Sequence, residues 1–152
     1  MNFDVVDMQI IRALQVDGTL SQNALAERVG ASPASCWRRV KALEDAGALR
    51  QTVRLADPQL LGLPLNVFCH IRLKNHLPQT TEDLEAMVSL HPEIVECYAM
   101  SGDWDYLLRI VCSDVAAYEN FLRKKILTAS SVANASSAFA LSQRKYTTAL
   151  PI

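Results

Sequence analysis

Residues 32–49 read SPASCWRRVKALEDAGAL, and they carry the start and stop signals of one short helix. Ser32 can cap the first turn, and Pro33 suits the first helical position, where an N–H would have no partner. Gly47 can take the left-handed conformation that closes a helix. The sequence therefore predicts a helix between these residues. Its apolar residues recur at i, i+4 and i+7 and form one narrow stripe: Cys36, Val40 and Leu43.

The other face of this segment is polar and basic. Five residues stand off the apolar stripe and are the candidates for contact with DNA: Ser35, Trp37, Arg38, Arg39 and Lys41. A buried seam and a basic outer face are what a DNA-reading helix needs. An ordinary surface helix with solvated charges fits the segment equally well when it is taken alone. Trp37 is also open to two interpretations, because it lies one residue off the stripe and could flank the core.

The composition of the chain limits its class. Its 152 residues suffice for one ordinary domain or two small ones, and half of them are hydrophobic, which favours a packed core over disorder. The net charge of −1 excludes a generic polyanion binder, so positive charge that binds nucleic acid must be local. Residues 38–54 carry such a patch, with five basic and two acidic side chains and a net charge of +3.

The cysteines and the N-terminus indicate the compartment. The four cysteines lie far apart, form no CxxC pair and sit in apolar runs, as buried thiols of a reducing compartment do. The first residues, MNFD, show no signal-peptide pattern, and the apolar runs are shorter than the ~18–20 residues of a membrane span. We therefore expect a cytoplasmic protein without a membrane segment.

Two further helices precede the quoted segment. Apolar residues place one helix over 4–16, and an Asp-Gly pair ends it. Ser21 can cap a second, shorter helix, which Gly30 ends. The link from there to Ser32 is so short that the second and third helices must cross steeply, as in a helix-turn-helix.

Residues 49–55 alternate apolar and polar side chains, which predicts a short strand after the third helix. Three short helices, a tight turn and a basic face together favour DNA binding over an ordinary surface helix. In that arrangement the start of the third helix enters the major groove, where arginine reaches guanine edges or phosphates. The expected partner is double-stranded DNA.

The rest of the chain alternates strands and helices. Residues 57–64 contain two prolines and a glycine and predict a linker. Side chains alternate with a period of two over 65–73, the pattern of a strand, and Thr80 or Thr81 can cap the helix that follows. The remaining predicted elements are strands over 94–100, 106–112 and 132–141, a short turn over 101–105 and a helix that Asp114 caps.

This β-α-β-β-α-β order predicts a ferredoxin-like, four-stranded antiparallel sheet with two helices on one face, in a chain of the α+β class. The predicted organisation is a DNA-binding domain over 1–56, a linker over 57–64 and a second domain over 65–152. The other face of the sheet is open and carries apolar residues, and a partner normally covers such a face. We therefore expect a homodimer whose two-fold symmetry presents two recognition helices to a two-fold DNA site.

With both halves in view, the whole chain resembles the Lrp/AsnC family of bacterial and archaeal transcriptional regulators. Four motifs carry the resemblance: Phe3-Asp4-x-x-Asp7, Ser21-x-x-x-Leu25-Ala26-x-x-Val29-Gly30, Ser32-Pro33-x-x-Cys36-x-x-Arg39-Val40-x-x-Leu43-Glu44-x-x-Gly47, and Ser101-Gly102-x-x-Asp105-Tyr106-Leu107-Leu108. The resemblance implies a winged helix-turn-helix for DNA and a regulator-of-amino-acid-metabolism (RAM) domain that dimerises and binds a small effector, usually an amino acid. It also implies that dimers assemble into octamers or larger particles.

The resemblance places the effector site between dimers, around the turn after the second strand of the second domain. By motif it points to Ser101, Gly102, Asp103, Asp105 and Tyr106, and also to Ala138, Phe139 and Ala140 on the last strand. An amino acid suits this chemistry, because the backbone N–H groups of a glycine turn hold a carboxylate and an aspartate pairs with an α-ammonium. Without the resemblance, the same residues favour a plain hairpin loop with aspartate as a turn former.

An enzyme and a sensor that contacts only proteins are the two alternatives to a DNA-binding regulator. For an enzyme or a metal site, His70, His76 and His91 fall on a strand, in a loop and at a helix end, without ligand spacing, and no phosphate loop or nucleophile motif is present. We therefore predict no catalysis and no metal or cofactor. An amino-acid-sensing module that contacts proteins instead of DNA is the alternative, which the basic patch disfavours. The prediction is a sequence-specific transcriptional regulator whose DNA binding or assembly an amino acid modulates, with the identity of that amino acid left open.

Overall fold

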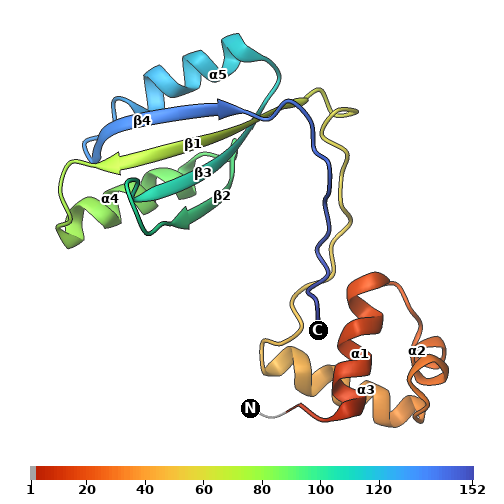
Figure 1. Ribbon diagram of the computed structural model, residues 1–152. Coiled ribbons are helices and arrows are strands. Elements are labelled where there is room, and N and C mark those ends of the chain that lie inside the picture. Colours follow the sequence, from red (N-terminus) through yellow and green to blue (C-terminus); the bar gives the residue numbers. More distant parts are fainter. Residues whose placement is uncertain (1–2) are drawn as a thin grey trace. The chain divides into compact units, whose positions relative to one another are not determined.

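The computed structural model describes residues 3–152, which form two compact units (Figure 1). The N-terminal unit comprises residues 3–55 together with Arg144–Ile152, and the sheet unit comprises Ala56–Gln143. The grouping differs from the predicted organisation at the C-terminal end, because the predicted second domain runs to residue 152.

The N-terminal unit contains the three predicted helices, α1 (Val5–Val16), α2 (Gln22–Val29) and α3 (Pro33–Asp45). Their ends follow the predicted signals. The Ser21 and Ser32 side chains accept hydrogen bonds from the amides of Ala24 and Ser35. Gly47 follows α3 with a φ of 72°, the left-handed conformation that closes the helix. Each helix contributes to one buried core: Ile10, Ile11, Ala13, Leu25, Ala26, Val29, Cys36 and Leu43.

An ion-pair cluster joins α3 to the start of α1. Arg39 Nη1 lies 2.7 Å from Asp4 Oδ2 and 2.6 Å from Asp7 Oδ1. The Asp4 carboxylate also caps α1, because it accepts a hydrogen bond from the Asp7 amide at 2.8 Å. That backbone bond first, and then the Arg39 side chain, hold the pKa of Asp4 below its ordinary value. The cluster therefore fixes the angle at which α3 leaves the core.

The predicted strand over residues 49–55 is wrong. In the part of the chain that the structure describes, no strand of a sheet includes these residues, and Val53 and Leu55 are exposed. Alternation alone does not make a strand, because its N–H and C=O groups need a neighbouring strand to bond.

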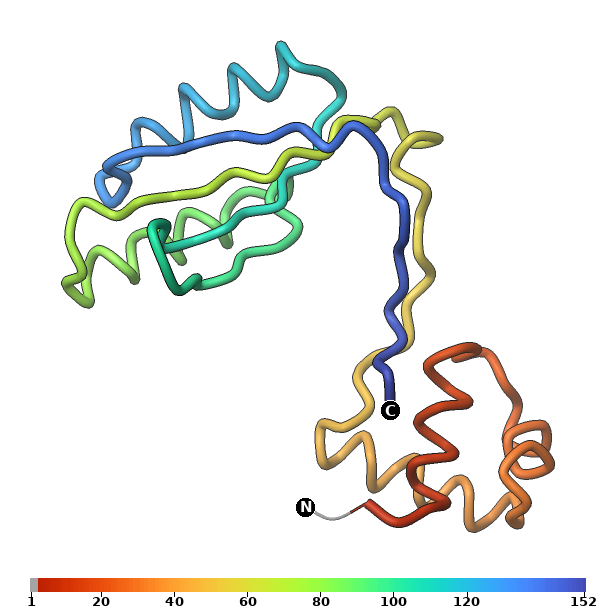
Figure 2. The backbone as a smooth tube through the Cα atoms, in the orientation of Figure 1, coloured from red at the N-terminus to blue at the C-terminus, as the bar shows by residue number. Residues whose placement is uncertain are grey.

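The C-terminal segment Arg144–Ile152 contacts α1. The Arg12 Nε donates to the carbonyl oxygen of Ile152 at 2.7 Å, and the amide of Leu150 donates to Gln15 Oε1 at 2.6 Å. Figure 2 follows the chain from the last strand of the sheet unit into this segment. These two bonds explain why the segment groups with the N-terminal unit.

The sheet unit has the predicted β-α-β-β-α-β order. Its strands are β1 (Leu65–Leu73), β2 (Ile94–Ala99), β3 (Tyr106–Cys112) and β4 (Val132–Phe139), arranged β2-β3-β1-β4 with every pair antiparallel. Helices α4 (Pro78–Leu90) and α5 (Val115–Phe121), and the π-helical turn η1 (Leu122–Ile126) that continues α5, pack on one face. The fold prediction is confirmed.

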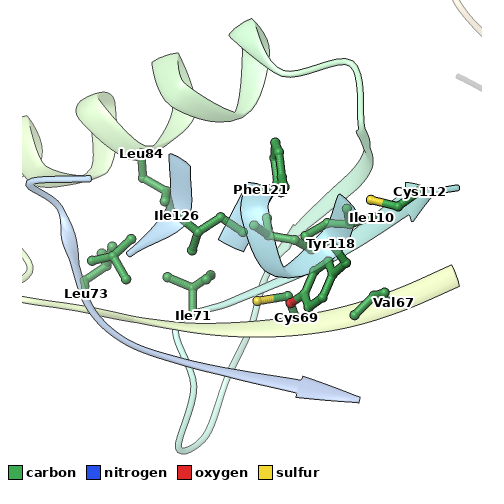
Figure 3. Close-up of a cluster of buried hydrophobic side chains, with 12 residues drawn as sticks. Val67, Cys69, Ile71, Leu73, Leu84, Ile110, Cys112, Tyr118, Phe121 and Ile126 are labelled. Carbon is green, nitrogen blue, oxygen red and sulfur yellow. The ribbon is translucent and has the colours of Figure 1, made fainter. Parts of the chain in front are cut away.

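Alternate residues of β1 fill the core between the sheet and the helices. Val67, Cys69 and Ile71 are fully buried, and Figure 3 shows them beneath Leu84 of α4 and Phe121 of α5. The Tyr118 hydroxyl in this layer is hydrogen-bonded to Ser137 Oγ, and burial raises the tyrosine's pKa well above its ordinary value. Both helices therefore share one core with the central strand.

Two predicted element ends were wrong. Helix α4 begins at Pro78, whose fixed φ suits the first helical position, and its capping residue Leu77 makes no side-chain bond because its side chain has no polar atom. Thr80 instead lies inside the first turn, where its hydroxyl donates to Asn75 Oδ1 at 2.6 Å. Strand β4 ends at Phe139, two residues before the predicted end.

The ion-pair cluster predicts a pH dependence. The pKa of Asp4 is lower in the folded than in the unfolded chain, so its bonds stabilise the fold above the unfolded pKa of about 3.9 and are lost as the pH falls through the folded value. Arg39→Leu is expected to raise the Asp4 pKa only part of the way to 3.9, because the Asp7 amide still donates to the carboxylate. Carboxyl-detected NMR titration measures both values.

Arg38→Leu is the matched control for this titration. Arg38 neighbours Arg39 but forms no ion pair with any residue from 3 to 152, so its removal is expected to leave the Asp4 pKa unchanged. An equal shift in both variants would show that net charge, and not the contact, sets the pKa.

Candidate DNA-binding and effector-binding sites

The outer face of α3 presents most of the predicted DNA-binding residues. Trp37 keeps 60% of its surface exposed, so the interpretation that it flanks the core is wrong. Arg38 and Lys41 are also exposed, and Ser35 is half-buried, with its amide bonded to Ser32 Oγ at 3.2 Å. Lys41 pairs with Asp45 at 3.0 Å one turn along the helix, and this exposed pair is weak enough for a phosphate to replace.

Arg39 differs from its neighbours because its guanidinium turns toward α1. Its Nη1 contacts both Asp4 and Asp7, and its Nε is buried without a hydrogen-bond partner among residues 3–152. These contacts raise the pKa of Arg39, with the Asp7 side chain as the larger cause. Sequence reasoning listed Arg39 with the outer face and missed both aspartates, although the acidic pair at the start of α1 was a visible signal.

The turn between β2 and β3 holds five of the predicted effector residues. Ser101, Gly102 and Asp103 are exposed, and Gly102 has a φ of 112°, which a side chain would strain. The Asp105 carboxylate accepts a hydrogen bond from the Leu73 amide at 2.7 Å. Tyr106 is half-buried and packs against the core of the sheet unit. Residues 101–103 of the turn are therefore exposed, whereas Asp105 and Tyr106 are held in place by the rest of the sheet unit.

Residues of β1 that the sequence did not indicate hold this turn in place. The Arg72 guanidinium donates two hydrogen bonds to the carbonyl oxygen of Asp103, at 2.6 and 3.1 Å. The same guanidinium lies 5.1 Å from the centre of the Trp104 ring, and the His70 ring lies 5.8 Å from it. His76 Nδ1 is 3.8 Å from Asp105 Oδ1. This network makes the turn more ordered than a plain hairpin loop.

The β4 residues predicted for the same site lie elsewhere on the sheet. Ala138 pairs with Phe68 and Phe139 with Val67, and the amide of Ala140 donates to the Asn66 carbonyl oxygen. The turn instead meets β1 at its other end, where the amide of Asp105 donates to the Ile71 carbonyl oxygen. The two sets are ~10–17 Å apart along β1 at its strand rise. Within one chain the structure does not bring them together.

Among residues 3–152, no helix is long and apolar enough to cross a membrane. The same residues contain no group of three or more histidine, cysteine, aspartate or glutamate side chains that could hold a metal ion.

Both units match known protein families. Residues 3–50 match the family described as winged helix-turn-helix DNA-binding, and residues 66–150 match the family described as the Lrp/AsnC ligand binding domain. Together the two matches cover both functional regions described above.

Individual relatives agree with these matches. The chain is 37% identical to the DNA-binding transcriptional activator DecR of Escherichia coli K12 over 149 residues, which is 98% of each protein. It is 38% identical over 124 residues to the leucine-responsive regulatory protein of Haemophilus influenzae, covering 82% of this chain and 75% of that protein.

Solved structures give the same result. A complex of the transcriptional regulator NMB0573 with L-Met from Neisseria meningitidis has a TM-score of 0.93 at 37% identity, covering 99% of this chain and 97% of that one. An AsnC family transcriptional regulator from Agrobacterium tumefaciens has a TM-score of 0.92 at 44% identity, with 98% and 97% covered. These relatives are regulators and not enzymes, which confirms the prediction that the chain is not catalytic. The chain belongs to the Lrp/AsnC family of transcriptional regulators.

Proposed function

We propose that this regulator reads duplex DNA with the outer face of α3. The observation that carries the proposal is the exposure of Trp37 and Arg38 on a helix whose opposite face is buried through Cys36 and Leu43. Arg38 can donate two hydrogen bonds to guanine or bind a phosphate, and the Trp37 ring offers an apolar surface and one N–H donor. Ser35 and Lys41 extend the contact along the helix.

Arg39 stabilises the position of this surface through contacts with α1. Its bonds to Asp4 and Asp7 hold α3 against α1, so Trp37 and Arg38 are presented by a helix of fixed orientation. A contact made by a preorganised helix loses less conformational entropy on binding. In this proposal Arg39 positions the recognition helix.

A homodimer would present two such helices. The open face of the sheet, opposite the helices, carries the half-buried side chains of Phe68, Leu107 and Val111. An ion pair on the same face joins Arg109 to Glu96 at 2.6 Å. An apolar patch with satisfied charges beside it suits a two-fold interface. We propose that two chains pair through this face and that dimers assemble further, to an octamer or larger.

The proposed effector is an amino acid bound at the turn over residues 101–105. The exposed backbone of Ser101 and Gly102 can receive the carboxylate, and the exposed side chain of Asp103 can receive the ammonium group. The L-Met complex of the Neisseria relative supports this class of ligand. Since the β4 residues Ala138, Phe139 and Ala140 lie away from the turn, a second copy would have to supply them. Differential affinity for two assemblies would make the amino acid a regulator.

The first experiment tests DNA binding. Duplexes are selected from a random-sequence pool with the full chain, and affinity for the recovered duplex is measured as a function of salt. A two-fold symmetric sequence is expected. Arg38→Ala is expected to weaken binding about fivefold or more, with relaxed selectivity at one base pair if Arg38 reads a base, or a salt slope smaller by about 1 if it binds phosphate.

Arg123→Ala is the control for this measurement. Arg123 is an equally charged, exposed residue of η1 in the sheet unit, and it pairs with Glu119 at 3.6 Å. Its removal is expected to leave DNA affinity unchanged. Full affinity of a chain with both Trp37→Ala and Arg38→Ala would disprove the α3 assignment, and failure to enrich any duplex would favour the protein-binding alternative.

The second experiment tests the effector turn. Thermal denaturation of the full chain is recorded with each of the twenty amino acids, and at least one is expected to raise the melting temperature by binding the folded state. Asp105→Asn with Asp103→Asn is expected to abolish that increase. The melting temperature without ligand should change little, because an asparagine oxygen still accepts the hydrogen bond from Leu73.

Asp57→Asn serves as the matched control, since Asp57 is an exposed aspartate that accepts a hydrogen bond from the Gln59 amide in a different loop. It should keep the whole response to the amino acid. A full response that survives in the turn variant would mean that the effector binds elsewhere.

A further inference from the structure

The start of α3 presents an exposed apolar patch. Pro33 and Ala34 in the first turn are exposed, and Trp37 in the second turn keeps 60% of its surface exposed. Side chains of a helix lean toward its N-terminus, so the Trp37 ring lies toward the turn that holds Pro33 and Ala34. These three residues are called the apolar start of α3 below.

The exposed charges of α3 lie beyond the apolar start. Arg38, Lys41, Glu44 and Asp45 are exposed, and all of them follow Trp37 along the helix. Because Arg38 is the next residue after Trp37, the apolar start is continuous with the surface proposed to bind DNA. In a helix-turn-helix the N-terminal residues of the second helix contact the base edges. The apolar start is therefore the part of α3 that is expected to meet the bases.

The backbone at this end of α3 is poorly equipped to hold a phosphate. Helix N-termini bind phosphates through backbone N–H groups that have no other partner. Pro33 has no N–H, the Ser35 amide donates to Ser32 Oγ at 3.2 Å, and the Cys36 amide donates to the Ser32 carbonyl oxygen at 2.9 Å. Among residues 33–36, this leaves only the Ala34 amide without a partner in the described chain. The apolar start therefore favours a base over a phosphate.

The major groove offers one apolar group among the four standard bases, the C5 methyl group of thymine. The other groups on the base edges there are hydrogen-bond donors and acceptors, which the side chains of Pro33 and Ala34 cannot pair with. The Trp37 indole has one donor and no acceptor, so it cannot form the two-bond pairs that select guanine or adenine. Its apolar ring is suited to the methyl group instead.

We infer that Trp37 and Ala34 bind the C5 methyl group of one thymine in each half-site. The inference rests on the proposed binding of duplex DNA by α3, and it deepens that function by naming the base and the group on it that the helix selects. Trp37 is then a specificity-determining residue, whereas Arg38 beside it supplies the charged contact. The DNA recovered from a random pool is expected to carry a thymine at one fixed place in each half-site.

Replacement of thymine by uracil tests the inference on the recovered duplex. Uracil keeps the base pair and the O4 acceptor and lacks only the methyl group. Each thymine is replaced in turn in one half-site, and the affinity of the full-length chain is measured at fixed salt. One position is expected to lose about fourfold in affinity, the effect of one buried methyl group, and the other positions are expected to change little.

A Trp37→Ala variant assigns this loss to the indole ring. The variant is expected to bind the thymine and uracil duplexes with equal affinity, because the ring that contacts the methyl group is gone. Trp37 is exposed, so its replacement leaves the buried stripe of α3 intact. Lys41→Ala is the matched control on the same helix. It is expected to weaken both duplexes by the same factor and to keep the fourfold preference for thymine.

Three outcomes would overturn the thymine contact. They are equal affinity of the unaltered chain for every uracil duplex, a preference for thymine that survives in Trp37→Ala, and a Trp37→Ala variant that loses the same factor on thymine and uracil duplexes. The last result would mean that the ring packs on the sugar–phosphate backbone without reading a base. Each leaves DNA binding by α3 standing as long as Arg38→Ala weakens binding, so the two failures are distinguishable.

Discussion

The pairing of β1 with both of its neighbours is the constraint on which the sheet unit depends. Side chains alternate along a strand, so one register decides both faces at once. Val67, Cys69 and Ile71 fill the core, and the residues between them form the open face. Arg72, at the end of the same strand, holds the turn over residues 101–105 through the Asp103 carbonyl oxygen. A shift of one residue would expose the core residues and bury Arg72, so the core, the open face and the turn depend on one register.

In the N-terminal unit, ion pairs between side chains set the orientation of the third helix, whereas in the sheet unit the pairing register sets the two faces. Its helices are short, and short helices are marginal unless tertiary contacts hold them. The buried stripe of α3 contributes such contacts, and the Arg39 bonds to Asp4 and Asp7 fix the orientation of α3 relative to α1. Consecutive arginines therefore have different tasks, because Arg38 faces solvent while Arg39 faces another helix. A DNA-binding surface of this kind depends on a residue that need not itself read a base.

The two ends of β3 differ in the polar groups that lie near them. At one end the polypeptide offers backbone N–H groups and aspartates at an exposed tip, which a second copy could complete. At the other end Glu93, Lys124 and Lys125 are among the residues that line a cavity.

The sequence by itself determined the elements of this protein and their order. Helix caps such as Ser32 and Gly47 and the alternation over 65–73 act within a few residues, so they can be read without a structure. Similarity of motifs supplied the family and the outline of both sites. The tertiary structure alone decided which way Arg39 turns, that residues 49–55 find no strand to pair with, and that Arg144–Ile152 packs on α1. It also separated Ala138 from the turn. Each of these depends on groups distant in sequence, whose distances are set only when the whole chain packs.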